Sequence, residues 1–149
     1  MDENRMIDIN IDIDELIINE FVGDVKEALV RAVDYTTIDM KSNIEKEAPV
    51  DEGKLQGNWH KEKLDDWVYS IFTNTEYAFW VDQGTGIYGH EQRRIYPKHG
   101  KYLSFEIDGE RIFVRSIAGQ KGANYTGKAE EATRARIEDF MKRAVASVA

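Results

Sequence analysis

Residues 16–49 read LIINEFVGDVKEALVRAVDYTTIDMKSNIEKEAP, and their apolar side chains recur at steps of three and four positions. The recurring positions are Leu16, Ile17, Phe21, Val22, Val25, Leu29, Ala32 and Val33, with Ile44 and Ala48 continuing the series. This spacing predicts one amphipathic helix from Leu16 to Glu47. A bend, if there is one, is expected at Tyr35-Thr36-Thr37. Pro49 ends the helix because the residue before a proline is pushed out of the helical region.

Before and after this helix the apolar period falls to two. Residues 7–14 alternate strictly between isoleucine and a polar residue, which predicts a strand with one apolar face. The segment 1–14 is therefore either an edge strand of the chain's own sheet or an extended arm on a neighbouring subunit. We favour the chain's own sheet, because exposed isoleucines would promote aggregation. Two further strand-like runs are residues 54–63 and 67–73.

The last third of the chain predicts a hairpin and a second helix. The runs 102–107 and 111–116 flank Asp108-Gly109, a strong signal for a tight hairpin turn. Residues 129–148 carry apolar side chains along one face and predict an amphipathic helix. The three glycines within residues 117–127 predict a flexible connection.

These elements predict an α+β fold, an antiparallel sheet packed by a long helix in the N-terminal half and a C-terminal helix. At 149 residues the chain is expected to form one domain, residues 1–149. It has no apolar run long enough for a membrane span, so no membrane partner is expected. The absence of cysteine excludes disulfides and is compatible with synthesis in a cytoplasm.

Charge is spread unevenly along the chain. Residues 1–52 carry 15 acids and 5 bases, which argues against phosphate binding by this part. The segment 85–101 is a basic loop that carries Arg93, Arg94, Lys98 and Lys101 and a single acid, Glu91. Four basic residues would bind DNA only weakly, and docking onto an acidic partner or a neighbouring copy is an equally good interpretation. Unlike patches on one subunit suit a head-to-tail ring.

Residues 77–89, YAFWVDQGTGIYG, combine four aromatic side chains with three glycines. Gly84, Gly86 and Gly89 form a G-x-G-x-x-G sequence, but a dinucleotide site needs a helix that opens at the third glycine. The polar residues that follow run into Pro97, so we reject nucleotide binding. Large rings beside flexible glycines suit a surface that packs closely against another molecule. Trp80 could equally be a core residue, because large aromatics dominate cores and interfaces alike.

No complete catalytic constellation is present. The three histidines are scattered without a metal-ligand spacing, so no metal and no cofactor are expected. Asp51, Glu52 and Asp82 could form a general acid/base pair, but Asp51-Glu52-Gly53 is better explained as a turn. We expect no enzymatic activity. The rival hypothesis is a small hydrolase that uses these carboxylates with His90.

Two motifs together resemble a phage family. Residues 48–59, APVDEGKLQGNW, are similar to its A-P-V-D-T-G-x-L-x-x-S pattern at the end of the first helix. Residues 77–85, YAFWVDQGT, are similar to its Y-A-x-x-V-E-x-G-T pattern. The family comprises the neck or tail-completion proteins of long-tailed bacteriophages, often described as head–tail joining proteins or minor tail components. Glu52, Asn58 and Asp82 depart from its usual threonine, serine and glutamate.

The resemblance implies a structural virion protein, made in the host bacterial cytoplasm, that forms a homo-oligomeric ring at the head–tail junction. The ring would be a hexamer, would contact neighbouring neck and tail proteins, and would let DNA pass without sequence-specific binding. A tail terminator or a minor tail component is the alternative. The motif residues carried over are Pro49, Asp51, Gly53, Leu55, Tyr77, Ala78, Gly84 and Thr85. The candidate interface residues are Phe79, Trp80, Tyr88, Arg93, Arg94 and Lys98.

Overall fold

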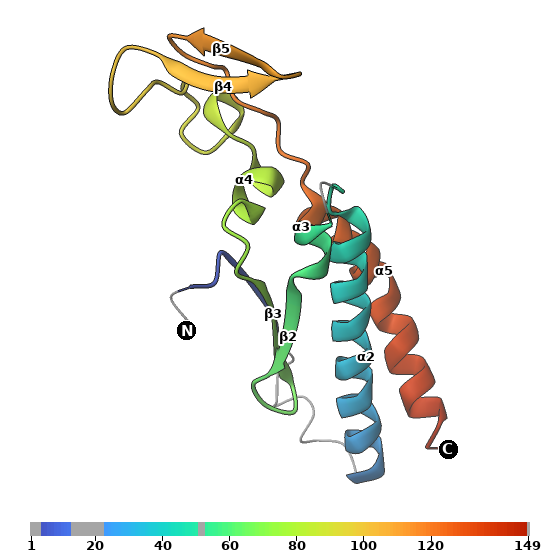
Figure 1. The fold of residues 1–149 in the computed structure, drawn as a ribbon. Coiled ribbons are helices and arrows are strands. Elements are labelled where there is room, and N and C mark those ends of the chain that lie inside the picture. The colour runs from blue at the N-terminus through green and yellow to red at the C-terminus, as the bar shows by residue number, and fades with distance from the viewer. Residues whose placement is uncertain (1–3, 13–22, 51–52, 149) are drawn as a thin grey trace. The chain divides into compact units, whose positions relative to one another are not determined.

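A computed structural model describes residues 4–12, 23–50 and 53–148 (Figure 1). The chain divides into two compact units. We call residues 1–78 with 125–149 the helical unit, and residues 79–124 the hairpin unit. That the chain is a single domain stays a prediction.

Helix α2 (Gly23–Glu47) is the long predicted helix, and the predicted first residues 16–22 lie outside the described part of the chain. Its buried side chains recur at the predicted steps of three and four, at Ala28, Leu29, Ala32, Val33, Thr36, Thr37, Met40 and Ile44. The helix continues without interruption through the segment where a bend was considered. The Thr36 and Thr37 hydroxyls donate to carbonyls four residues back, so both buried groups are satisfied within the helix.

The sheet of the helical unit has three antiparallel strands in the order β1-β3-β2. The strands are β1 (Ile7–Asp12), β2 (Trp59–Lys63) and β3 (Val68–Thr73). Ile9 of β1 and Lys61 of β2 both lie opposite Ile71 of β3. The N-terminal strand is therefore an edge strand of the chain's own sheet, as favoured from its alternation.

The core of the helical unit lies between α2 and the sheet. Leu29 and Val33 of α2 form a buried cluster with Tyr69 of β3 and with Trp67, which immediately precedes that strand. Met141 of α5 (Tyr125–Ala146) packs against the same cluster. Figure 1 shows α2 and α5 side by side along the unit. The predicted α+β class, an antiparallel sheet packed by a long helix and a C-terminal helix, is confirmed.

The strand predicted at residues 54–63 begins later in the structure than expected. Residues 54–57 form the short helix α3 (Lys54–Gly57), and the strand starts only at Trp59. Gly53 has a φ of 74°, in the left-handed region, and its carbonyl accepts from the Gly57 N–H at 3.1 Å. This turn buries Leu55, so a single helical turn replaces the extended backbone expected there.

Helix α5 begins at Tyr125, one turn before the predicted start at Ala129. The Tyr125 side chain is fully buried, and its ring meets Trp59 edge-on at 6.1 Å between centroids. Its hydroxyl donates to the Ala78 carbonyl at 3.0 Å. These contacts fix the first turn of the helix on the core, which apolar periodicity alone does not reveal.

The hairpin unit contains most of α4 (Ala78–Gln83), the 3₁₀ turn η1 (Gly86–Tyr88), and strands β4 (Leu103–Ile107) and β5 (Glu110–Val114). Asp108 and Gly109 have φ values of 51° and 82°, so the predicted hairpin turn is confirmed. Residues 117–123 are not the flexible connection that was predicted, because their backbone is hydrogen bonded to residues 81–95. The Ile95 and Ile117 backbones, for example, exchange both hydrogen bonds.

Candidate partner interface

The glycine-rich motif is a place of close backbone approach. Residues 84–86 run against residues 118–122, with the Thr85 N–H donating to Gln120 at 2.9 Å and the Ile87 N–H to Ala118 at 2.8 Å. A Cβ on Gly86 would lie 2.0 Å from the Ala118 carbonyl oxygen. The glycines therefore serve backbone packing within the hairpin unit, which accounts for the G-x-G-x-x-G sequence without a nucleotide.

Asp82 is buried beside this contact. Its carboxylate accepts from the Gln83 amide at 2.8 Å, and its backbone carbonyl accepts from the Asn124 N–H at 2.9 Å. The neighbouring Val81 carbonyl accepts from the Ala123 N–H at 2.8 Å. The backbone carbonyls of Val81 and Asp82 thus help to hold two distant segments of the hairpin unit together. Asp51 and Glu52, its suggested catalytic partners, lie outside the described residues.

Three aromatic side chains of the motif point to solvent. Trp80 is 52% exposed, and Phe79 and Tyr88 are also exposed. The Phe79 and Trp80 rings meet edge-on at 5.1 Å, and the Lys121 ammonium lies 5.8 Å from the centre of the Tyr88 ring. Trp80 is therefore not a core residue of the described chain. Its role as an interface residue stays a prediction.

The hairpin unit buries no large apolar side chain among the described residues. The fully buried apolar side chains of the described chain all belong to the helical unit. Eight of the fifteen exposed large apolar side chains belong to the hairpin unit: Phe79, Trp80, Ile87, Tyr88, Tyr96, Tyr102, Ile107 and Phe113. This unit therefore presents apolar surface that nothing in the described chain covers completely.

The hairpin β4–β5 has one apolar face. Leu103 lies opposite Val114 and Phe105 lies opposite Ile112, so these four side chains share a face with Ile107. None of the five is fully buried. A two-stranded sheet is marginally stable in water unless its apolar face packs on something else. Four of these side chains are half-buried and Ile107 is exposed, so the described chain covers this face only in part.

The basic loop 85–101 lies on the surface of the same unit. Arg93 forms an ion pair with Glu91 at 2.6 Å, Arg94 donates to the Ser116 hydroxyl at 2.9 Å, and Lys98 is exposed. The hairpin unit carries seven bases and five acids, and the helical unit carries 13 bases and 23 acids. The two units therefore have net charges of opposite sign.

The first motif has a structural role wherever the structure describes it. Pro49 follows the end of α2, Gly53 makes the left-handed turn, and Leu55 is buried in the core. In the second motif, Tyr77 is exposed and Ala78 is buried, where its carbonyl accepts from the Tyr125 hydroxyl. Tyr125 was missed as an anchor, since its only sequence signal is an aromatic residue after a glycine-rich run.

Comparison with protein-family models, with curated proteins and with solved structures found no match for this chain. Among residues 4–12, 23–50 and 53–148, no three histidine or carboxylate side chains gather so that they could hold a metal ion. No helix in that part of the chain is long and apolar enough to cross a bilayer.

Proposed function

We propose that this protein is a structural component of a long-tailed phage virion. It assembles into a homo-oligomeric ring at the head–tail junction, where it joins or completes the tail without catalytic turnover. The observation that carries the proposal is the hairpin unit, which exposes Trp80, Phe79 and Tyr88 and buries no large apolar side chain of its own among the described residues. The two motifs that resemble the neck and tail-completion family point to the same role.

A small unit without a buried apolar core gains stability by covering its apolar surface in an assembly. Burying a large apolar side chain is worth about 1.5–3 kcal/mol, so even a few covered rings matter to a unit this small. Clustered exposed aromatics are also the usual mark of a protein–protein interface. The hairpin unit is therefore the surface through which we expect copies to associate.

The charges of the two units support a head-to-tail arrangement. A hairpin unit with more bases than acids can face the acid-rich helical unit of the next copy, and such contacts between unlike patches close into rings. The family resemblance implies a hexamer. It also implies that DNA passes through the ring, and an excess of carboxylates in the first third of the chain suits passage without sticking.

Electron microscopy of phage particles tests this role. A phage that carries a stop codon at Tyr35 of this gene is supplied in trans with the wild-type chain, with Trp80→Ala, or with Leu64→Ala as a matched exposed apolar residue of the helical unit. Without the chain, we expect DNA-filled heads beside finished, unattached tails. The wild-type chain and Leu64→Ala should restore virions, and Trp80→Ala should not.

The purified Trp80→Ala chain should keep the wild-type circular dichroism spectrum, because its side chain is exposed. Attached tails of uncontrolled length would assign the chain to tail termination instead. Complete virions without the chain, or full rescue by Trp80→Ala, would contradict the proposed role.

A further inference from the structure

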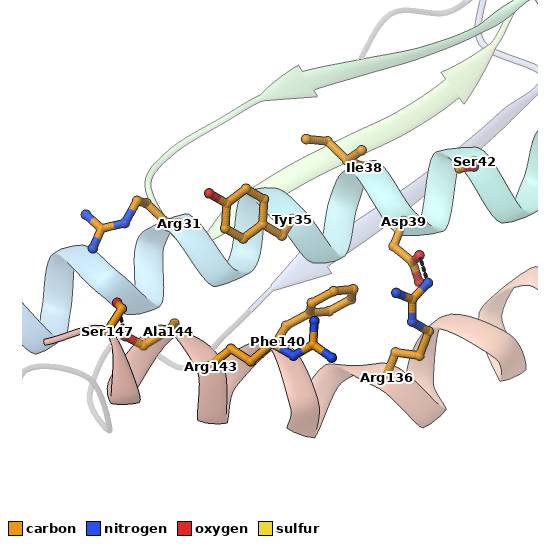
Figure 2. A pocket seen from close by; sticks show the side chains of 10 residues that line it. All are labelled: Arg31, Tyr35, Ile38, Asp39, Ser42, Arg136, Phe140, Arg143, Ala144 and Ser147. Atoms are coloured by element: carbon orange, nitrogen blue, oxygen red, sulfur yellow. Dashed lines mark hydrogen bonds and ion pairs between the residues drawn. The ribbon is translucent and has the colours of Figure 1, made fainter. Parts of the chain in front are cut away.

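A groove of about 620 Å³ lies between α2 and α5 in the helical unit (Figure 2). The residues that line it are Arg31, Tyr35, Ile38, Asp39, Ser42, Arg136, Phe140, Arg143, Ala144 and Ser147. The helices are antiparallel here, because Asp39 pairs with Arg136 while Asn43, one turn later, pairs with Thr133, earlier in α5. The groove thus follows the helix pair.

The groove carries apolar side chains that the described chain leaves open. Tyr35 is 54% exposed and Ile38 is 46% exposed, on adjacent turns of α2. Phe140 and Ala144 line the groove from α5, one turn apart. Neither Tyr35 nor Ile38 is needed for the core, which is built from other positions of α2. These side chains are therefore available to a partner.

The groove is cationic, although the helical unit that carries it is acidic. Three arginines line it, Arg31, Arg136 and Arg143, against the single carboxylate of Asp39. Arg136 already pairs with Asp39, and the Arg136 guanidinium lies 5.0 Å from the centre of the Phe140 ring. Arg143 has only a long 3.4 Å contact with Asp139, and both side chains are exposed. The local excess of positive charge favours an acidic occupant.

We propose that this groove binds an acidic amphipathic helix of a partner protein. The lining residues span twelve positions on α2 and twelve along and just past the end of α5, which corresponds to about 16 Å, or three helical turns. A helix of that length can lay apolar side chains at steps of three and four on Tyr35, Ile38 and Phe140. Its flanking carboxylates then meet Arg31 and Arg143.

A second copy of this chain fits the groove less well. Two-fold pairing of the same face would set Arg31 and Arg143 of one copy against those of the other, and like charges at close range repel. The inference does not depend on the ring or on a place at the head–tail junction, since it concerns a different surface from the hairpin unit.

Fluorescence anisotropy on the full chain tests the groove. The probe is a labelled amphipathic peptide of about 15 residues, with leucines on one face and glutamates beside them, and its control carries lysine at each glutamate position. We expect the acidic peptide to bind, and we expect its affinity to fall as the salt concentration is raised. Arg31→Glu combined with Arg143→Glu should weaken binding at least about tenfold, and Tyr35→Ala should weaken it as well.

Arg134→Glu is the matched control. Arg134 is an exposed arginine of α5 that pairs with Glu130 and does not line the groove, so binding should change less than about twofold. Thermal unfolding checks that every variant is folded. The proposal is overturned if the acidic peptide fails to bind at about 1 mM, if the lysine peptide binds equally well, or if the double variant binds like the wild type. Wild-type dimers that dissociate in the double variant would overturn it too, because a second copy would then fill the groove.

Discussion

Gly86→Ala tests the contact that organises the hairpin unit. Gly86 has a φ of 62°, and a Cβ at this position would lie 2.0 Å from the Ala118 carbonyl oxygen and 2.7 Å from its carbonyl carbon. Both atoms belong to the backbone, so the clash cannot be relieved by turning a side chain. The two segments would have to separate.

Three contributions make up the free energy by which Gly86→Ala destabilises the closed hairpin unit. Alanine in the left-handed region costs about 1–2 kcal/mol. Separation of the segments also breaks the hydrogen bonds from the Thr85 N–H to Gln120 and from the Ile87 N–H to Ala118, each worth about 1 kcal/mol net. The total is about 3–4 kcal/mol. Because 1.4 kcal/mol is a factor of ten, local opening should become at least about a hundredfold more frequent.

Gly100→Ala is the matched control. Gly100 also has a positive φ, of 80°, and belongs to the same unit, but a Cβ there meets nothing within 4 Å. Only the conformational cost of about 1–2 kcal/mol remains, so opening should rise about five- to thirtyfold at most. The difference between the two variants isolates the clash.

Hydrogen exchange read by mass spectrometry measures the opening. Peptides that cover residues 84–95 and 116–124 should exchange much faster in Gly86→Ala than in Gly100→Ala, while peptides from α2 exchange at the wild-type rate. Equal exchange in the two glycine variants would refute the argument that backbone approach at Gly86 holds the unit together.

Two further predictions concern buried tyrosines. Tyr125→Phe leaves the buried Ala78 carbonyl without its 3.0 Å donor and should lower the free energy of unfolding in urea by about 1–3 kcal/mol, whereas exposed Tyr96→Phe should leave it unchanged. Burial raises the pKa of the Tyr69 phenol, and the Asp34 carboxylate raises it further. The unfolded chain therefore ionises first, and stability is lost as pH rises above about 10. In urea titrations, the free energy of unfolding of Tyr69→Phe should fall less between about pH 9 and pH 11 than that of the wild type. An equal fall in both proteins would contradict this prediction.

The sequence predicts the parts of the fold that depend on local chemistry. The turn at Asp108-Gly109 follows because both residues must adopt a positive φ, which this pair tolerates well. Helix α2 and the extended conformation of β1 follow because one buried face imposes a regular period on the chain. In each case the residues that carry the signal lie within a few positions of one another.

The parts that were not predicted depend on contacts between distant segments. Gly119 looks like a flexible link in the sequence, yet a Cβ on it would lie 2.2 Å from the Thr85 carbonyl oxygen. The missing side chain that permits flexibility also permits this close approach, and the sequence cannot distinguish the two. The groove between α2 and α5 was not predicted for the same reason. Tyr35 and Phe140 are apolar positions whose exposure is decided by how two distant helices pack.

The two units differ in what stabilises them, and this difference bears on assembly. The helical unit has a buried core that includes Leu29, Val33 and Trp67. The hairpin unit relies on backbone hydrogen bonds between residues 81–95 and 117–124, while eight of its large apolar side chains are exposed and the others are only half-buried. Such bonds gain strength when a partner excludes water, because the local dielectric constant falls. Covering Trp80 and its neighbours would thus bury apolar area and strengthen the hydrogen bonds that the adjacent Val81 and Asp82 carbonyls accept. In the proposed assembly, association and the stability of the hairpin unit would therefore reinforce each other.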